Sequence, residues 1–278
     1  MAKKVLVTGA GGYIGCHVVT ALCDMGAEVI AVDFATDRID NRAQRIVYYI
    51  FNGSPNIYED LGRPDVCLHM AWKDGFVHNS PAHMEYLSKH YGFICDMIKG
   101  GLKQIAVMGT MHEVGYHEGA IDENTPCNPT SLYGIAKDAL RRSVFLTMKG
   151  HEDVCLQWLR AYYIFGDDKR SNSIFAKLTA AAEEGRETFP FTSGKNMYDF
   201  ISVDELSQQI AACVMQTEVD GIINCCTGKP VTLAEKVEGF IKEHGFNIRL
   251  SYGAFPDRPY DSPGVWGDAT KINQIMNK

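Results

Sequence analysis

The sequence predicts an α/β protein built on a doubly wound parallel sheet, with a small lobe attached at its C-terminal end. Apolar runs of strand length alternate with longer amphipathic stretches over residues 1–165, and a glycine-rich turn joins the first run to the first amphipathic stretch. This alternation is typical of parallel sheets with helices on both faces. The 278 residues are 46% hydrophobic and 22% charged, which suits one large domain with an attached lobe.

Glycines at a spacing of three join the first strand to the first helix. The apolar run 5–7 predicts the strand, and apolar residues recur with helical period from Ile14 to Leu22. The spaced glycines are Gly9, Gly12 and Gly15. Such a turn lets backbone amides and the positive end of the helix approach a pyrophosphate, although glycine also marks ordinary turns. In this strand–turn–helix context, the glycines predict a Rossmann-like dinucleotide site.

Asp33 directly follows the second predicted strand, residues 29–32. A carboxylate at this place can bind both ribose hydroxyls of an adenosine, and it would repel a 2′-phosphate. We therefore expect NAD rather than NADP. NADP stays an alternative, because Arg38 is near enough in sequence to hold the extra phosphate if the loop folds back.

The remaining elements continue the alternation. Strands are predicted at 46–51, 66–70, 104–108 and 154–160, with helices at 84–98 and 132–149. Beyond Gly166, residues 173–184 and 231–244 are helix-like, 200–203 and 222–225 are strand-like, and 189–195 are rich in loop residues. We expect a Rossmann-like NAD(P)-binding domain at 1–165, with 196–227 returning to it. The segments 166–195 and 228–278 then form the lobe, with a cleft between the two parts.

Three side chains predict a hydride-transfer site. Tyr133 and Lys137 lie one turn apart on a predicted helix and share a face. The ammonium favours the ionised phenol and brings its pKa towards the operating pH, as proton transfer at a carbonyl or carbinol requires. Thr110 follows strand 104–108, at the edge where open parallel sheets bind ligands, so its hydroxyl can bond the same oxygen. A tyrosine and a lysine four apart also occur by chance, but here they follow the glycine turn and Asp33.

Together these features resemble the extended short-chain dehydrogenase/reductase superfamily, in its NAD-dependent epimerase/dehydratase (nucleotide-sugar) branch. The resemblance covers nearly the whole chain, and its further marks are the segments 9–15, 65–71, 198–205 and 257–259. It implies a cofactor along the first sheet, a nucleoside-diphosphate sugar in a substrate-binding C-terminal lobe, and a homodimer built on the helix of Tyr133. Arg141 and Arg142, on that helix, are expected at the solvent or at this seam.

The resemblance also implies individual contacts. The cofactor contacts are Gly9, Gly12, Tyr13, Ile14, Gly15, Asp33, Met70, Ala71, Trp72, Tyr133, Lys137 and Tyr162. The substrate contacts are Thr110, Tyr163, Asn172 and Arg258, the last matching an arginine that contacts the diphosphate or the nucleotide ribose. His112 is added to the substrate contacts because it follows Thr110 by two residues.

Departures from the family pattern indicate the subclass. Tyr163 stands where epimerases and dehydratases carry asparagine, and it resembles the tryptophan that reductases of 4-keto-6-deoxy sugars carry there. Met111 and His112 replace the acid and base that dehydration needs, with Glu113 one step late. Trp72 replaces the usual second alanine after the strand, which indicates an altered pocket near the nicotinamide.

Composition excludes several other classes. No apolar run approaches the roughly 20 residues of a membrane helix, and Met1-Ala-Lys-Lys leads straight into a strand, which predicts no signal peptide. Nine scattered cysteines indicate reduced thiols in a cytoplasm, and the net charge of −7 argues against non-specific binding to nucleic acid. His112 and His117 lack a partner at metal-ligand spacing, and surface or packing roles are expected for His78, His83 and His90.

We therefore expect an NAD(P)-dependent oxidoreductase that reduces the C4 keto group of a nucleoside-diphosphate 4-keto-6-deoxy sugar. In this reaction Tyr133 gives its proton to the keto oxygen, Lys137 lowers the pKa of Tyr133 and holds the nicotinamide ribose, and Thr110 orients the carbonyl. One alternative is a 4-epimerase that uses the same residues with a retained NAD. The other is a non-catalytic, cofactor-sensing regulator.

Overall fold

Seven parallel strands form the main sheet of the computed structural model, which describes residues 2–166, 173–257 and 262–277. Their order is β12-β7-β5-β4-β1-β2-β3. Their bounds are β1 (Lys4–Thr8), β2 (Glu28–Val32), β3 (Gln44–Ile46), β4 (Val66–His69), β5 (Gln104–Thr110), β7 (Cys155–Ala161) and β12 (Gly221–Cys225). After β3, at one edge of the sheet, the chain returns to the middle and adds β4 on the other side of β1. The strand order therefore reverses beside β1, which confirms the predicted doubly wound α/β class.

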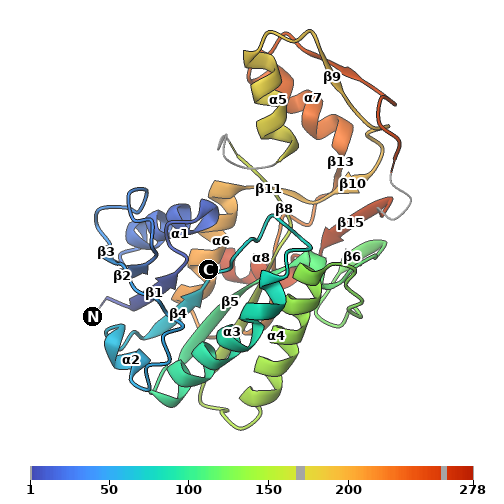
Figure 1. The fold of residues 1–278 in the computed structure, drawn as a ribbon. Helices are drawn as coiled ribbons and strands as arrows, with labels where there is room; N and C mark the ends of the chain where they lie inside the picture. Colours follow the sequence, from blue (N-terminus) through green and yellow to red (C-terminus); the bar gives the residue numbers. More distant parts are fainter. Residues whose placement is uncertain (1, 167–172, 258–261, 278) are drawn as a thin grey trace.

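Helices cover both faces of the sheet (Figure 1). On one face α1 (Tyr13–Asp24) packs on α6 (Val203–Met215), which contacts α8 (Thr270–Met276). On the other face α3 (Ala82–Lys99) packs on α4 (Leu132–Met148) and on the short α2 (Ile57–Asp60). Each face has its own buried apolar cluster, and both faces of the central strands are therefore removed from water.

The predicted strand at 46–51 is wrong over most of its length. Strand β3 ends at Ile46 after three residues paired with β2, and the apolar run that follows leaves the sheet. Val47 and Tyr49 are exposed, while Tyr48 to Phe51 line a pocket described below. The apolar side chains of this run thus line a ligand-sized groove at the edge of the sheet and do not form a strand.

Smaller sheets complete the C-terminal half. A four-stranded sheet has the order β13-β10-β15-β6, and β8 pairs with β11 and β9 with β14. The bounds are β6 (Gly119–Ile121), β8 (Tyr163–Phe165), β9 (Thr188–Pro190), β10 (Met197–Tyr198), β11 (Phe200–Ser202), β13 (Val231–Thr232), β14 (Arg249–Ser251) and β15 (Gly264–Gly267).

Helices α5 (Ile174–Glu183) and α7 (Leu233–Glu243) stand apart from the main sheet with β9, at the top of Figure 1. Phe175 of α5 packs on Phe240 of α7, with ring centroids 5.1 Å apart. By contrast, α8 packs on α6 and β12, beside the main sheet. The final helix therefore lies against the sheet and not with α5 and α7, although both α7 and α8 fall in the range 228–278.

A buried carboxylate ties the two parts of the C-terminal half together. Asp199, between β10 and β11, accepts hydrogen bonds from the backbone nitrogens of Thr227, Gly228 and Gly267. Asp199 thereby joins the end of β12 to β15.

Within the described ranges, no helix is long and apolar enough to cross a lipid bilayer.

Candidate active site

The turn after β1 brings backbone segments into close contact. Gly9 has a φ of +74°, and a Cβ on it would lie 2.6 Å from the backbone nitrogen of Ala71. A Cβ on Gly15 would lie 2.1 Å from the carbonyl oxygen of Gly9. Gly12 is the N-cap of α1 and makes no side-chain capping bond, which leaves the first amides of the helix for a ligand. The turn therefore has the shape that a pyrophosphate site requires.

Asp33 lies beside this turn at the end of β2. Its Oδ2 accepts a hydrogen bond from the backbone nitrogen of Gly11 at 3.0 Å, and its Oδ1 accepts one from that of Ala35 at 3.2 Å. Each carboxylate oxygen keeps a further lone pair for a ribose hydroxyl. A Cβ on Gly11 would lie 1.9 Å from the carbonyl oxygen of Ala35. The spacing argument missed Gly11, and the signal for it was the Gly11-Gly12 pair.

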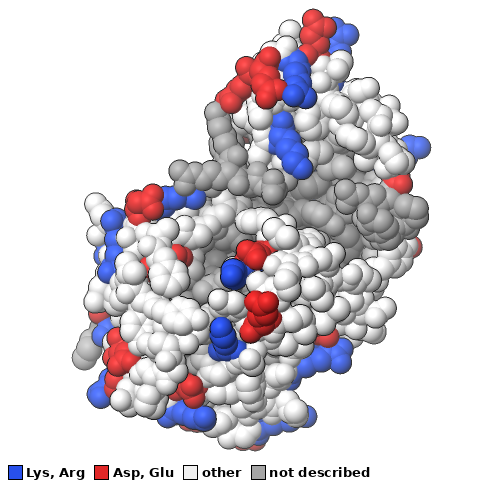
Figure 2. Space-filling model, viewed as in Figure 1, with Lys and Arg blue, Asp and Glu red and all other residues white. Residues whose placement is uncertain are grey.

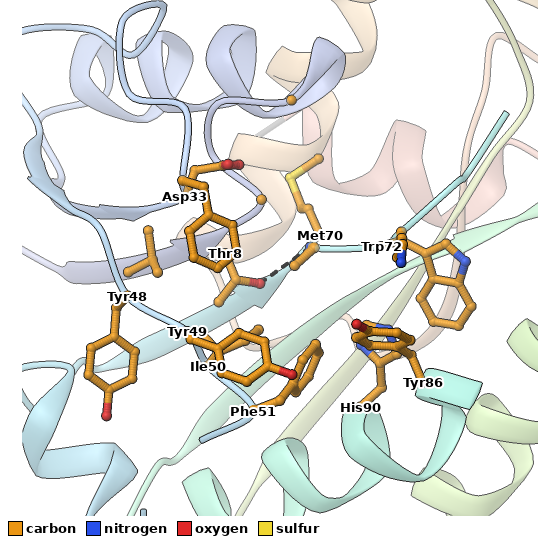
Figure 3. Close-up of a pocket in the computed structure, with 16 residues that line it drawn as sticks. Thr8, Asp33, Tyr48, Tyr49, Ile50, Phe51, Met70, Trp72, Tyr86 and His90 are labelled. Carbon is orange, nitrogen blue, oxygen red and sulfur yellow. Dashed lines mark hydrogen bonds between the residues drawn. The ribbon is translucent and has the colours of Figure 1, made fainter. Parts of the chain in front are cut away.

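A pocket of about 410 Å³ runs from Asp33 to Trp72. Figure 3 shows these two side chains on opposite sides of it, with the rings of Tyr49, Phe51 and His90 beneath. Six residues expected at the cofactor line it: Gly9, Gly12, Asp33, Met70, Ala71 and Trp72. Its size, its carboxylate and its glycine turn fit a dinucleotide such as NAD.

Thr110, Tyr133 and Lys137 meet at the carboxyl end of β5. Burial raises the pKa of Tyr133 to about 12, and a hydrogen bond with the side chain of Thr110 opposes that rise. Lys137 is 3% exposed, and its Nζ donates to the carbonyl oxygen of Met108 at 2.7 Å. Burial lowers the pKa of Lys137 to about 7, against the opposing charge of Glu113. The expected lowering of the Tyr133 pKa is therefore absent in the chain alone, and the phenol is protonated at neutral pH.

Trp72 joins this group to the pocket. The Nζ of Lys137 lies 3.7 Å from the centre of the Trp72 ring, a cation–π distance, and the ring lies edge-on to Tyr133 at 6.1 Å. The indole nitrogen donates to Nδ1 of His83 at 3.0 Å, and His90 stacks on the indole at 4.3 Å. Trp72 was expected to alter the pocket near the nicotinamide, and its indole forms a wall between the pocket and the catalytic residues.

His83 and His90 belong to this wall, so of the surface or packing roles expected for them, both have the packing role. Both are buried on α3, at 1% and 2% exposure. His90 also bonds His69, whose other ring nitrogen bonds the hydroxyl of Thr8, both at 2.8 Å. Their spacing along α3 was a usable signal, because residues seven apart lie on the same face of a helix.

Glu113 fixes the backbone of Thr110 through a buried hydrogen bond. Its fully buried carboxylate accepts hydrogen bonds from the backbone nitrogen of Thr110 at 2.7 Å and from the indole nitrogen of Trp158 at 2.8 Å. It also forms ion pairs with Arg141 at 3.2 Å and with Arg160 at 3.5 Å. With Thr110 it forms the capping box of the short 3₁₀ helix η1 (Met111–Glu113).

The expectation that Arg141 faces solvent or a subunit seam is wrong, because Arg141 pairs with the buried Glu113 and with Asp138. A signal for this was its place four residues after Lys137, on the same helix face. Arg142, whose side chain is 62% exposed, does lie at the surface.

The other expected site residues are spread around this centre. Tyr13 and Ile14 open α1, and the hydroxyl of Tyr13 lies beside Gly166. Tyr163 lies on β8, with its ring 4.3 Å from that of Tyr198. Tyr162 is 6% exposed, packs against Gly267 and does not line the pocket. Two expected substrate contacts, Asn172 and Arg258, lie outside the described residues.

Comparison with known sequences identifies the family. The sequence profile of the NAD dependent epimerase/dehydratase family matches residues 5–226. The chain belongs to this family. It is 45% identical over 268 residues to the dTDP-6-deoxy-L-talose 4-dehydrogenase (NAD(+)) of Aggregatibacter actinomycetemcomitans, covering 95% of this chain and 99% of the relative. It is 26% identical over 318 residues to a probable UDP-arabinose 4-epimerase 3 of Oryza sativa subsp. japonica, covering 98% and 77%.

Solved structures of nucleotide-sugar epimerases share the fold. A UDP-N-acetylglucosamine 4-epimerase from Methanobrevibacter ruminantium M1 superposes with a TM-score of 0.86 at 20% identity, covering 100% of this chain and 93% of that one. A UDP-glucuronic acid 4-epimerase from Bacillus cereus gives 0.80 at 21% identity, covering 99% and 93%. The expected class and cofactor are confirmed: the chain is an NAD-dependent nucleotide-sugar enzyme of the extended short-chain dehydrogenase/reductase superfamily.

Proposed function

We propose that the protein interconverts an alcohol and a ketone at C4 of a nucleoside-diphosphate 6-deoxy sugar, with reduction of the 4-keto sugar as the favoured direction. The observation that carries this proposal is the 45% identity, over nearly the full length of both chains, to a dTDP-6-deoxy-L-talose 4-dehydrogenase. Oxidation of a C4 hydroxyl is the reverse of the reduction that the sequence predicts. The relative also favours dTDP as the nucleotide.

The catalytic geometry supports this chemistry. Tyr133 is protonated at neutral pH, as a donor to a keto oxygen must be, and Thr110 offers a second hydrogen bond to the same oxygen. When Lys137 is protonated, its buried ammonium lies beside the phenol, and this charge stabilises the phenolate that forms when Tyr133 loses its proton. Held by the glycine turn and Asp33, a bound NAD would supply hydride exchange at the sugar carbon.

We propose most of the cofactor contacts among the residues that line the pocket and the glycine turn. The glycine turn would hold the pyrophosphate, Asp33 the adenosine ribose, and Met70 to Trp72 the nicotinamide half. A 2′-phosphate beside Asp33 would meet a carboxylate of like charge, which supports NAD over NADP.

Bulky side chains support a dehydrogenase over an epimerase. An epimerase must let a keto intermediate present its other face to the retained cofactor, and this needs a roomy pocket. Trp72 fills one wall and is fixed by His83, while Tyr163 is packed on Tyr198. Both aromatics favour a single pose of the sugar. Met111 and His112 after Thr110 provide no carboxylate pair for dehydration.

We further propose that α5 and α7 form the substrate lobe and that two chains pair through α3 and α4. Exposed apolar side chains on α3 and α4, namely Met84, Ile135 and Leu146, support the pairing. A monomer mass in light scattering would contradict the dimer.

All nine cysteines are unpaired thiols, which supports a reducing compartment such as the cytoplasm.

A substrate panel tests the proposed function. The purified protein is mixed with NADH and dTDP-4-keto-6-deoxy hexoses, and with UDP-glucose and UDP-arabinose as alternatives. We expect NADH consumption with a dTDP-4-keto sugar, and NAD reduction when the matching 4-hydroxy sugar is supplied. Interconversion of UDP-sugars without any net change in NADH would contradict the proposal.

A further inference from the structure

Five histidines surround the catalytic group, and they divide into two kinds. The ring nitrogens of His69 and His83 are all hydrogen-bonded within the protein, as is one nitrogen of His90. The rings of His78 and His112 make no hydrogen bond with any residue of the described ranges. Three histidines are therefore part of the scaffold, and two present open ring nitrogens.

The two open rings flank Tyr133. His78 stacks on the phenol ring with an interplanar angle of 14° and centroids 5.5 Å apart. The His112 ring lies 4.5 Å from that of His78 and 6.3 Å from that of Tyr133. Any group bonded to these nitrogens therefore lies beside the residue that gives the proton.

Both rings are held before a ligand arrives. The backbone nitrogen of Tyr133 donates to the carbonyl oxygen of His78 at 2.8 Å. Because Nδ1 of His83 accepts from Trp72, its Nε2 carries the proton and donates to the carbonyl oxygen of Val77 at 2.9 Å. The loop that presents His78 is thus fixed at two successive residues. His112 is held by its backbone bond to the hydroxyl of Thr110 at 3.3 Å.

The pair is uncharged at neutral pH. Burial lowers the pKa of His112 to about 4, aided by His78, and burial with the neighbouring His83 lowers the pKa of His78. A neutral imidazole offers one donor and one acceptor, which matches a hydroxyl group and not a phosphate. In Figure 2, charged side chains of both signs lie beside the hollow of that face, amid residues that carry no charge.

We propose that His78 and His112 bind the C3 hydroxyl of the sugar and make the enzyme selective for substrates that carry it. This inference rests on the proposed function, because the reacting carbon is taken as C4. In a 6-deoxy sugar, C3 is the one neighbour of C4 that bears a hydroxyl, since C5 bears the ring oxygen and the methyl group. The oxygen of this hydroxyl is two bonds from C4, the carbon whose oxygen receives the proton of Tyr133.

Kinetics of matched variants test the pair. His78→Phe and His112→Phe keep an aromatic ring but remove both nitrogens. We expect kcat/KM to fall about fivefold to tenfold for a substrate with the C3 hydroxyl, the size of one lost neutral hydrogen bond. For the 3-deoxy analogue the same variants should equal wild type. His151→Phe, in the loop before β7, is the control. Equal losses on both substrates would overturn the inference.

A binding measurement does not depend on turnover. The ring nitrogens of the histidines are followed by NMR in the wild-type protein with NAD, while dTDP- and UDP-sugars are added singly. We expect the signals of His78 and His112 to shift with a 3-hydroxy sugar and to move little with its 3-deoxy analogue. If no sugar shifts them, the pair is not a sugar site. If they shift but no 4-keto sugar is turned over, only the proposed function fails.

Discussion

Tyr133 is held by contacts on two sides, with Thr110 at its hydroxyl and His78 against its ring. Thr110, Tyr133 and Lys137 could be predicted from the sequence because their relation is local. A spacing of four sets two side chains on one helix face, and the carboxyl end of a parallel strand is where ligands bind. The contact of Arg141 with Glu113 could not be predicted in this way, because it depends on how α4 packs beside η1.

Replacing Tyr133 with phenylalanine removes one proton donor and little contact area. We expect turnover to fall roughly 10²- to 10⁴-fold, the usual contribution of general acid catalysis. The affinity for NADH, measured by fluorescence titration, should stay close to that of wild type. Tyr116→Phe, at an exposed tyrosine, is the matched control. Retention of more than half of the wild-type rate would remove Tyr133 from the mechanism.

The depressed pKa of Lys137 predicts how stability depends on pH. The pKa is about 7 in the folded chain and 10.5 for an unperturbed lysine, so between these values the unfolded chain binds more protons. Burying the charged ammonium therefore lowers the unfolding free energy most below pH 7. As the pH rises above 7, Lys137 loses its proton in the folded chain and the unfolding free energy increases. Within this window the increase approaches about 1.4 kcal/mol per pH unit.

Urea unfolding of wild type and Lys137→Met at several pH values from 6 to 9 measures this contribution. We expect the unfolding free energy of wild type, minus that of the variant, to rise with pH above 7. A difference that stays constant over the whole range would show that Lys137 does not titrate there.

At the scale of elements, the turn between β1 and α1 illustrates what a spacing pattern can and cannot predict. Three spaced glycines located the turn, but the closest backbone approach is at Gly11. Which carbonyl lies against a glycine depends on the loop after β2, and the sequence of the turn does not contain that information. The run 46–51 is similar, because its apolar residues have the composition of a strand but line the pocket.

Gly11→Ala would place a methyl group 1.9 Å from the carbonyl oxygen of Ala35, so the turn must move. We expect NAD affinity, measured by calorimetry, to fall at least about tenfold, since roughly 1.4 kcal/mol of displaced contact suffices. Gly239→Ala on α7 is the control, because its Cβ would meet nothing within 4 Å. That variant should bind NAD normally and gain about 0.5–1 kcal/mol in stability. Unchanged NAD affinity in Gly11→Ala would contradict the assignment of the turn.

Glu113 links η1, α4 and β7 through its buried ion pairs. Glu113→Gln would leave Arg160, which is fully buried, without its carboxylate partner. We expect a loss of about 3–5 kcal/mol in unfolding free energy, the usual cost of breaking a buried pair from one side. Glu123→Gln, in the exposed pair with Lys271, should cost less than about 1 kcal/mol. Equal losses in the two variants, measured by urea unfolding, would show that the Glu113 network is not structural.

At the scale of the whole molecule, the parallel sheet could be predicted because its strands are continuous apolar runs separated by helices. The four-stranded sheet could not, because strands of two to four residues carry too little pattern. It also joins segments far apart in sequence, such as β6 and β15. The position of α8 could not be predicted either, because it depends on the packing of this helix on α6 and β12.

The transfer of a labelled hydride tests the central claim most directly. The protein is incubated with NADH carrying deuterium at both positions of the nicotinamide C4 and with a dTDP-4-keto-6-deoxy hexose, and the product is examined by NMR and mass spectrometry. We expect one deuterium at C4 of the sugar for each NADH consumed, and far less labelled product in the same time with the Tyr133→Phe variant. A protein that holds NAD tightly and interconverts two 4-hydroxy sugars, with no deuterium taken from added NADH, would be an epimerase and would contradict the account.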